Sequence, residues 1–127
     1  KVYRSILETI FNTPIDSKHY LNFGHINVYP KNSFITKHSD ETKEKDRLFT
    51  TLFFLNANRK YEDGSLLKVY TNENVVDIVP DFNTIVVLEN KIYNYSHEVT
   101  ENLSDNIRYS IYTPFNDESY LKIIENK

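Results

Sequence analysis

The sequence of 127 residues has a formal net charge of −3, 39% hydrophobic residues and no cysteine. This length suits about one domain with one hydrophobic core, and the missing cysteines exclude disulfides, thiolate metal sites and cysteine nucleophiles. Because acidic and basic residues are interspersed and no run of about 18 apolar residues occurs, we expect no nucleic-acid-binding face and no membrane span.

Methionine is absent, even at position 1. We therefore expect residues 1–127 to form a single domain that is the core fragment of a longer chain. No basic-then-apolar leader is visible, so a cytoplasmic location is the default expectation.

Residues 2–12 place apolar side chains about 3.6 positions apart, which predicts a short N-terminal helix ending at Thr13-Pro14. The rest of the chain predicts short strands separated by turns rich in Asn, Asp, Gly and Pro. We expect strands near residues 20–29, 33–38, 48–56, 66–71, 75–79, 84–89, 94–99, 106–113 and 119–125. Short strands at such regular spacing favour a mainly β fold, either a sandwich or a barrel.

A histidine and a carboxylate stand two residues apart in His38-Ser39-Asp40. Side chains at i and i+2 of an extended backbone point the same way, so His38 and Asp40 can face one point and a distant His97 can complete a group of three. Two histidines and one carboxylate on one face are the ligand set of non-haem Fe(II) oxygenases. Taken alone, the first pair could be an ordinary polar loop and His97 a core histidine.

The strand predicted at 107–113 carries an arginine among apolar residues. Its alternation puts Arg108, Ser110 and Tyr112 on one face. An arginine fork with a hydroxyl two residues on is a good receptor for a carboxylate. The alternative is a cation on an exposed strand face, but a buried arginine would demand an anionic partner.

With these residues in place, the chain resembles the Fe(II)/2-oxoglutarate-dependent dioxygenases, in particular their prolyl-4-hydroxylase-like branch. Order and spacing agree over roughly residues 20–115. The segments that carry the resemblance are Ile26-Asn27-Val28-Tyr29-Pro30, His38-Ser39-Asp40, Arg47 to Asn56, Glu62-Asp63-Gly64-Ser65-Leu66, Val79-Pro80, Thr84 to Leu88, Ser96-His97-Glu98-Val99 and Arg108.

The resemblance implies a double-stranded β-helix, a form of jelly roll or cupin-like fold, with the metal inside its open end. It implies an oxidoreductase in which Fe(II), held by His38, Asp40 and His97, uses O₂ and 2-oxoglutarate to hydroxylate an unactivated C–H bond, releasing succinate and CO₂. Ascorbate would sustain turnover. Related halogenases replace the carboxylate ligand with a small residue, so Asp40 favours hydroxylation.

The resemblance also implies roles for residues around the co-substrate. Arg108 would bind the far carboxylate of 2-oxoglutarate, and Ser110, Tyr29 and Tyr112 would add hydroxyl groups. Phe54 departs from the family, where a tyrosine often touches the co-substrate, and Thr50 or Tyr112 could replace that contact. His25 has no counterpart ligand, and we expect it to have a surface or packing role.

The substrate implied by the resemblance is a prolyl residue of a protein or peptide. Lysyl residues, free amino acids and small metabolites stay open as alternatives. Demethylases of alkylated nucleic acids are a rival reading, but they carry a second arginine where this chain has Pro114. A rival of another class is a jelly-roll binding module with a degenerate site, which the intact metal set and Arg108 disfavour.

Overall fold

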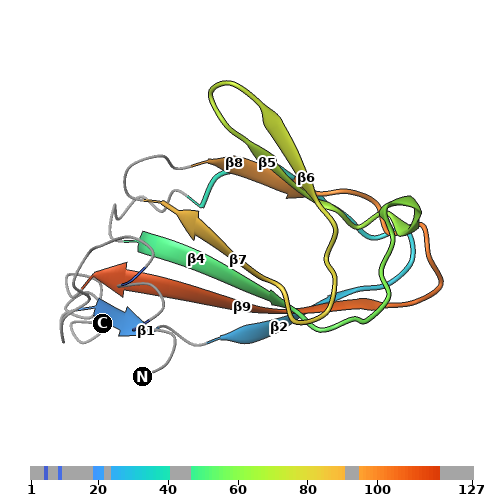
Figure 1. The fold of residues 1–127 in the computed structure, drawn as a ribbon, viewed down its shortest axis with the longest axis horizontal. Helices are drawn as coiled ribbons and strands as arrows, with labels where there is room; N and C mark the ends of the chain where they lie inside the picture. Colours follow the sequence, from blue (N-terminus) through green and yellow to red (C-terminus); the bar gives the residue numbers. More distant parts are fainter. Residues whose placement is uncertain are drawn as a thin grey trace, which may run out of the picture.

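The structure, a computed structural model, describes residues 5, 9, 19–21, 24–40, 47–90 and 95–117. Of the described residues, those from 19 to 117 form strands and one short 3-10 turn, η1, and the strands build two antiparallel sheets (Figure 1). The elements are β1 (His19–Leu21), β2 (His25–Tyr29), β3 (Ile35–His38), β4 (Arg47–Phe54), η1 (Tyr61–Asp63), β5 (Leu67–Tyr70), β6 (Val75–Ile78), β7 (Ile85–Glu89), β8 (Ser96–Val99) and β9 (Arg108–Asp117).

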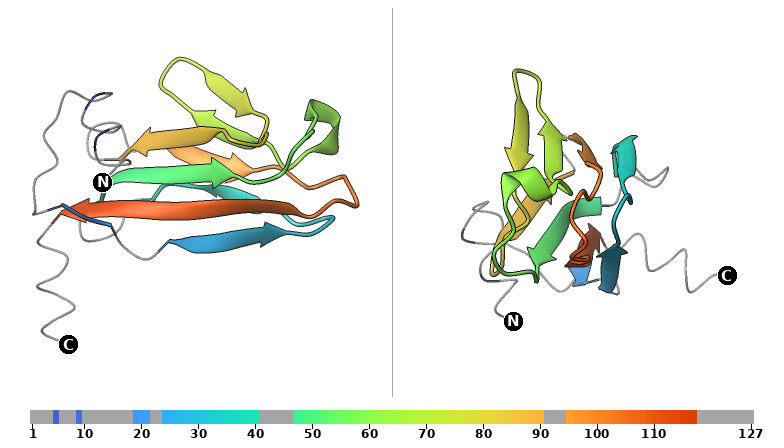
Figure 2. Two further views of the ribbon diagram at one scale, coloured as in Figure 1. Left: turned by 60° about the horizontal axis from the view of Figure 1, so that its bottom comes forward. Right: turned by 90° about the vertical axis from the view of Figure 1, so that its right-hand side faces the viewer.

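The two sheets face each other across one core. In the larger sheet β9 pairs with β4 on one side and with β1 and β2 on the other, and β7 pairs with β4. The smaller sheet has the order β3-β8-β5-β6. Figure 2 shows β9 running along the length of the larger sheet, with β2 beside it. The buried core comes from both sheets and consists of Leu52, Phe54, Leu67, Val69 and Leu88. The predicted jelly-roll fold is confirmed.

Alternation explains why these strands pack in this way. In β9 the side chains of Arg108 and Ser110 are buried, whereas Ile107, just before the strand, and Tyr109 are exposed to 37% and 38%. The predicted inward face of this strand is therefore the face that the structure buries.

The strand predicted over residues 20–29 is wrong as a single element, because β1 and β2 occupy that range separately. Both pair with β9: Leu21 lies opposite Phe115 and His25 lies opposite Tyr112. Four residue steps separate Leu21 from His25, whereas three separate Phe115 from Tyr112, so β1 and β2 do not pair with β9 in one common register. Pro114, which cannot donate a backbone hydrogen bond, lies at the level of this change in register.

Two predicted elements fall largely outside the described residues. Of the helix predicted at 2–12, the structure describes Ser5 and Thr9, which are helical, and the Thr9 hydroxyl donates to the Ser5 carbonyl at 2.9 Å. The strand predicted near 119–125 lies wholly outside them. Among the residues described, no helix is long and apolar enough to cross a membrane.

A buried polar cluster fixes the loop that leads into β9. Asn102 is fully buried, and its amide donates to the carbonyls of Tyr29, at 2.9 Å, and Asn106, at 3.1 Å. Arg59 donates to the Asn102 side-chain oxygen at 3.1 Å. Gly64 forms an isolated β-bridge with Asn102. This cluster holds the end of β2 against the start of β9.

Gly64→Ala should destabilise the fold. Gly64 has a positive φ of 68°, and an added Cβ would lie 2.1 Å from the carbonyl oxygen of Glu101, so the backbone would have to move. We expect a loss of at least about 2 kcal/mol in the free energy of unfolding, measured by urea denaturation. Gly24→Ala is the control, because its Cβ would meet the movable Thr113 hydroxyl at 3.2 Å. Equal losses in the two variants would contradict the prediction.

Candidate active site

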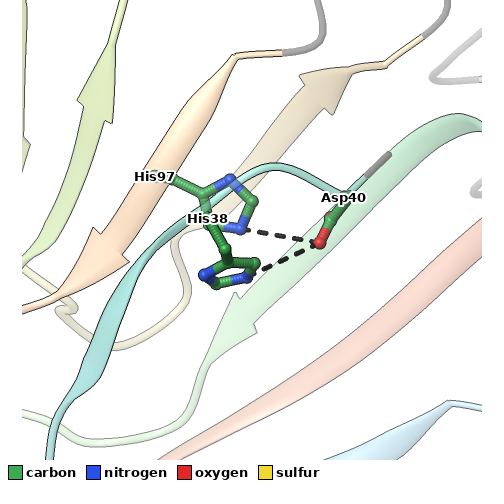
Figure 3. Close-up of side chains that lie close together, drawn as sticks. All are labelled: His38, Asp40 and His97. Atoms are coloured by element: carbon green, nitrogen blue, oxygen red, sulfur yellow. Dashed lines mark ion pairs between the residues drawn. The ribbon is translucent and has the colours of Figure 1, made fainter. Parts of the chain in front are cut away.

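Strand pairing brings three potential metal ligands together. His38 ends β3 and lies directly opposite His97 of β8, and their ring centres are 4.4 Å apart. Asp40 follows β3, and its Oδ1 lies 3.7 Å from Nε2 of each histidine (Figure 3). One ligand atom from each residue lies within 4.8 Å of the others. The sequence spacing and the cross-strand pair together create this cluster.

Each histidine is oriented by the backbone carbonyl two residues before it. Nδ1 of His38 lies 2.9 Å from the Thr36 carbonyl oxygen, and Nδ1 of His97 lies 3.2 Å from that of Tyr95. Since a carbonyl only accepts, Nδ1 carries the proton in each ring and Nε2 offers its lone pair. Both Nε2 atoms face Asp40, as metal ligation requires.

Asp40 is held by a residue of the larger sheet. Its side chain is 8% exposed, and its Oδ2 accepts a hydrogen bond of 2.6 Å from the Thr50 hydroxyl. The sequence suggested Thr50 as a possible replacement contact for the co-substrate. In the structure its hydroxyl is directed to Asp40 instead, because β4 carries Thr50 on the face turned toward the smaller sheet.

Arg108 is buried, and two of its guanidinium nitrogens have no hydrogen-bond partner among the described residues. Its side chain is 1% exposed, and its guanidinium carbon lies 4.5 Å from the ring centre of Tyr29 and 5.1 Å from that of Phe54. Among the described residues, nothing accepts a hydrogen bond from Nε or Nη1, and the Ser110 hydroxyl is likewise buried and unpaired. Buried polar groups are normally satisfied, so these donors indicate a site for an anion.

The electrostatics of Arg108 favour the same conclusion. Burial lowers the pKa of Arg108 to about 10, and the neighbouring Tyr29 opposes that shift. Because the pKa in the fold lies below the unfolded value, the charged form counts against folding by roughly 3 kcal/mol at neutral pH. That contribution is lost only as the pH rises above 10. Burial also raises the pKa of Tyr29, so its phenol stays protonated and can donate.

One cavity of about 350 Å³ connects the metal cluster to Arg108. Its lining includes His38, Asp40, His97 and Arg108, together with the predicted residues Tyr29 and Tyr112. Ser110 is not part of this lining, although it lies on the same strand face. The structure thus brings six of the seven predicted site residues to one cavity.

Two polar lining residues, His25 and Asn27, were not assigned to the site from the sequence. His25, which we expected to have a surface or packing role, is exposed, and its ring lies 4.7 Å from that of Tyr112, its partner on β9. A signal was available, because period two backwards from Tyr29 places Asn27 and His25 on the same face of β2.

The profile of the 2OG-Fe(II) oxygenase superfamily matches residues 24–115, most of the chain. The chain belongs to this family. Membership implies Fe(II), 2-oxoglutarate and O₂ as cofactor and co-substrates, and it fits the His-Asp-His cluster. Among curated proteins, none matches the sequence.

Solved structures share the fold of this oxygenase. At 28% identity and a TM-score of 0.70, it is similar to a prolyl hydroxylase from Trichoplax adhaerens in complex with a hypoxia inducible factor oxygen degradation domain peptide fragment; the match covers 79% of this chain and 46% of that one. A Pseudomonas putida prolyl-4-hydroxylase matches at 24% identity and a TM-score of 0.66, over 74% of this chain and 50% of that one. A 2OG-Fe(II) oxygenase family oxidoreductase from Burkholderia pseudomallei matches at 22% identity and a TM-score of 0.75, over 89% of this chain and 51% of that one. The chain spans about half the length of these relatives.

Proposed function

We propose that this oxygenase hydroxylates a prolyl residue of a protein or peptide, consuming O₂ and 2-oxoglutarate and releasing succinate and CO₂. The observation that carries the proposal is one cavity holding a His-Asp-His cluster at one place and a buried arginine with unpaired donors at another. A metal centre beside a carboxylate receptor is what a 2-oxo diacid needs in order to bind through both ends. We also propose that the chain acts as a single catalytic domain.

The donor set suits Fe(II), with Nε2 of His38, Nε2 of His97 and Oδ1 of Asp40 as the ligands. When bound, the iron supplies the activation of O₂ that no side chain can provide. The chain itself sets the geometry: the carbonyls of Thr36 and Tyr95 orient the two imidazoles. Burial of His97 and Asp40 also limits water at the cluster.

For the co-substrate, we propose that Arg108 binds the carboxylate far from the metal. The unpaired guanidinium donors would bind it, and Ser110 would add its hydroxyl. Tyr29, whose ring lies against the guanidinium, would donate its phenol from the side of β2. Tyr112 borders the same cavity and would add a further hydroxyl contact.

Support for a prolyl substrate comes from the relatives, two of which are prolyl hydroxylases, one of them solved with a peptide. Lysyl residues and small amino acids or metabolites are the competing substrates. A catalytically degenerate binding module is the alternative outside enzymes.

An anaerobic titration with Fe(II) and 2-oxoglutarate tests the proposal first. We expect a visible metal-to-ligand charge-transfer band, followed in air by succinate formation that increases with prolyl peptides and with ascorbate. Mass spectrometry should find one added oxygen on proline. Absence of the band in folded protein would favour the binding module, whereas a band with oxygen added only to lysyl peptides or metabolites would overturn the prolyl assignment.

A further inference from the structure

The two carboxylate oxygens of Asp40 have different surroundings. Oδ1 lies 3.7 Å from Nε2 of His38 and 3.7 Å from Nε2 of His97. Oδ2 accepts the hydrogen bond of 2.6 Å from the Thr50 hydroxyl. Separations of about 2.5–2.7 Å are typical of an O–H donor on an ionised carboxylate, and such bonds are roughly twice as strong as neutral ones. Asp40 therefore presents one fixed oxygen to the histidines, as Figure 3 shows.

The larger sheet fixes the donor. Thr50 lies on β4 opposite Pro114 of β9, and it is fully buried. Asp40 follows β3 of the smaller sheet, so their hydrogen bond joins the two sheets. The next residue, Thr51, is also buried, but its hydroxyl donates to the Thr113 carbonyl at 3.1 Å within the larger sheet. The two neighbouring threonines thus have comparable burial and different acceptors.

We infer that Thr50 is a positioning residue that restricts Asp40 to binding the metal through Oδ1 alone. This inference rests on the proposed function. A carboxylate can bind a metal through one oxygen or both, and chelation would occupy a further coordination position. The hydrogen bond to Oδ2 opposes the rotation of the carboxylate that chelation requires. Coordination positions on a bound metal would therefore stay available for a 2-oxo acid, which needs two of them.

A purely structural role for Thr50 gives a different expectation. The hydroxyl would then only satisfy a buried acceptor, and its loss would cost about 1–3 kcal/mol of stability. The loss of the Thr51 hydroxyl should cost a similar amount. Neither change would then alter the number of atoms that the protein donates to the metal. Metal affinity and metal spectroscopy therefore separate the two roles, whereas stability alone does not.

The experiment uses three variants of the chain. Thr50→Val removes the hydroxyl at nearly constant volume, Thr50→Ser keeps it, and Thr51→Val is the matched control. Calorimetry measures Mn(II) affinity without co-substrate, and visible absorption of the Co(II) form reports coordination number. We expect Thr50→Val to change the Co(II) spectrum, because the released carboxylate can add its second oxygen. We expect it also to weaken Mn(II) binding about 10- to 100-fold, because the carboxylate is no longer oriented before the metal binds, with the other two variants within about threefold of wild type.

The outcomes are distinguishable. If Thr50→Val binds Mn(II) as tightly as Thr51→Val and its Co(II) spectrum is that of wild type, the inference is overturned and the proposed function stands. A Thr50→Ser protein with the affinity of the valine variant overturns it too. A wild-type chain that binds neither metal overturns the proposed function, and the inference with it. Should Thr50→Val fail to fold by circular dichroism, Thr50→Ala replaces it under the same criteria.

Discussion

Asp40→Ala should abolish metal-dependent turnover and weaken Mn(II) binding by roughly 1,000-fold or more. Loss of a hydrogen bond that supports a ligand already costs about 10- to 100-fold in metal affinity, and this variant removes the ligand itself. It also removes the one anionic member of the cluster, leaving two neutral imidazoles for a divalent cation. Calorimetry with Mn(II) and a succinate assay measure the two effects.

Thermal unfolding provides an independent check of the same variant. Mn(II) at about 100 times its dissociation constant should stabilise the wild-type chain by roughly 2.7 kcal/mol, and the variant should gain nothing. Glu98→Ala is the matched control, because Glu98 neighbours His97 on β8 but accepts a hydrogen bond from Tyr70, at 2.8 Å. Retention of metal binding by Asp40→Ala would refute the assignment of the ligands.

Arg108→Met should separate stability from co-substrate binding. Two charge-assisted hydrogen bonds are worth about 1.5–3 kcal/mol each, so the Kd for 2-oxoglutarate should rise at least about 100-fold. At the same time the burial penalty of the guanidinium, which lowers its pKa to about 10, disappears. The variant should therefore unfold at the same urea concentration as wild type or a higher one. Fluorescence titration and urea denaturation measure both quantities.

Arg59→Met is the control, because Arg59 is a second buried arginine with a structural environment. It donates to the carbonyls of Asn106, Asp63 and Gly64 and to the Asn102 side chain, at 3.1 to 3.4 Å. Its loss should lower stability, since it removes four hydrogen bonds from the cluster around the buried Asn102, and should leave the Kd for 2-oxoglutarate within about threefold of wild type. If Arg108→Met destabilises the fold as Arg59→Met does, Arg108 is a structural residue.

The local parts of the fold and site follow from sequence periodicity. Side chains alternate between the two faces of a strand, which puts Arg108 and Ser110 on a buried face and Tyr109 on an exposed one. The same rule aligns His38 with Asp40. Placing His97 beside them needs the pairing of β3 with β8, which the residues alone do not reveal. The resemblance to a family supplied that step.

Contacts between the sheets could not be read from periodicity. The hydrogen bond from Thr50 to Asp40 depends on how the two sheets face each other, so a strand pattern gives no sign of it. Arg59 is polar and lies outside a strand, yet the cluster around Asn102 buries it. The separation of β1 from β2 was missed, because their two registers against β9 are not visible in the sequence.

The orientation of the two histidines has a consequence for how such a scaffold can diverge. Backbone carbonyls two residues before each histidine hold both rings, and every amino acid supplies a backbone carbonyl. Side chains elsewhere in the cavity, such as His25, Asn27 and Tyr112, can therefore change without releasing these two ligands. Mutation of the walls would alter which molecules are accepted while the imidazole pair persists. A fold that holds its metal ligands independently of the cavity walls can acquire new substrates in small evolutionary steps.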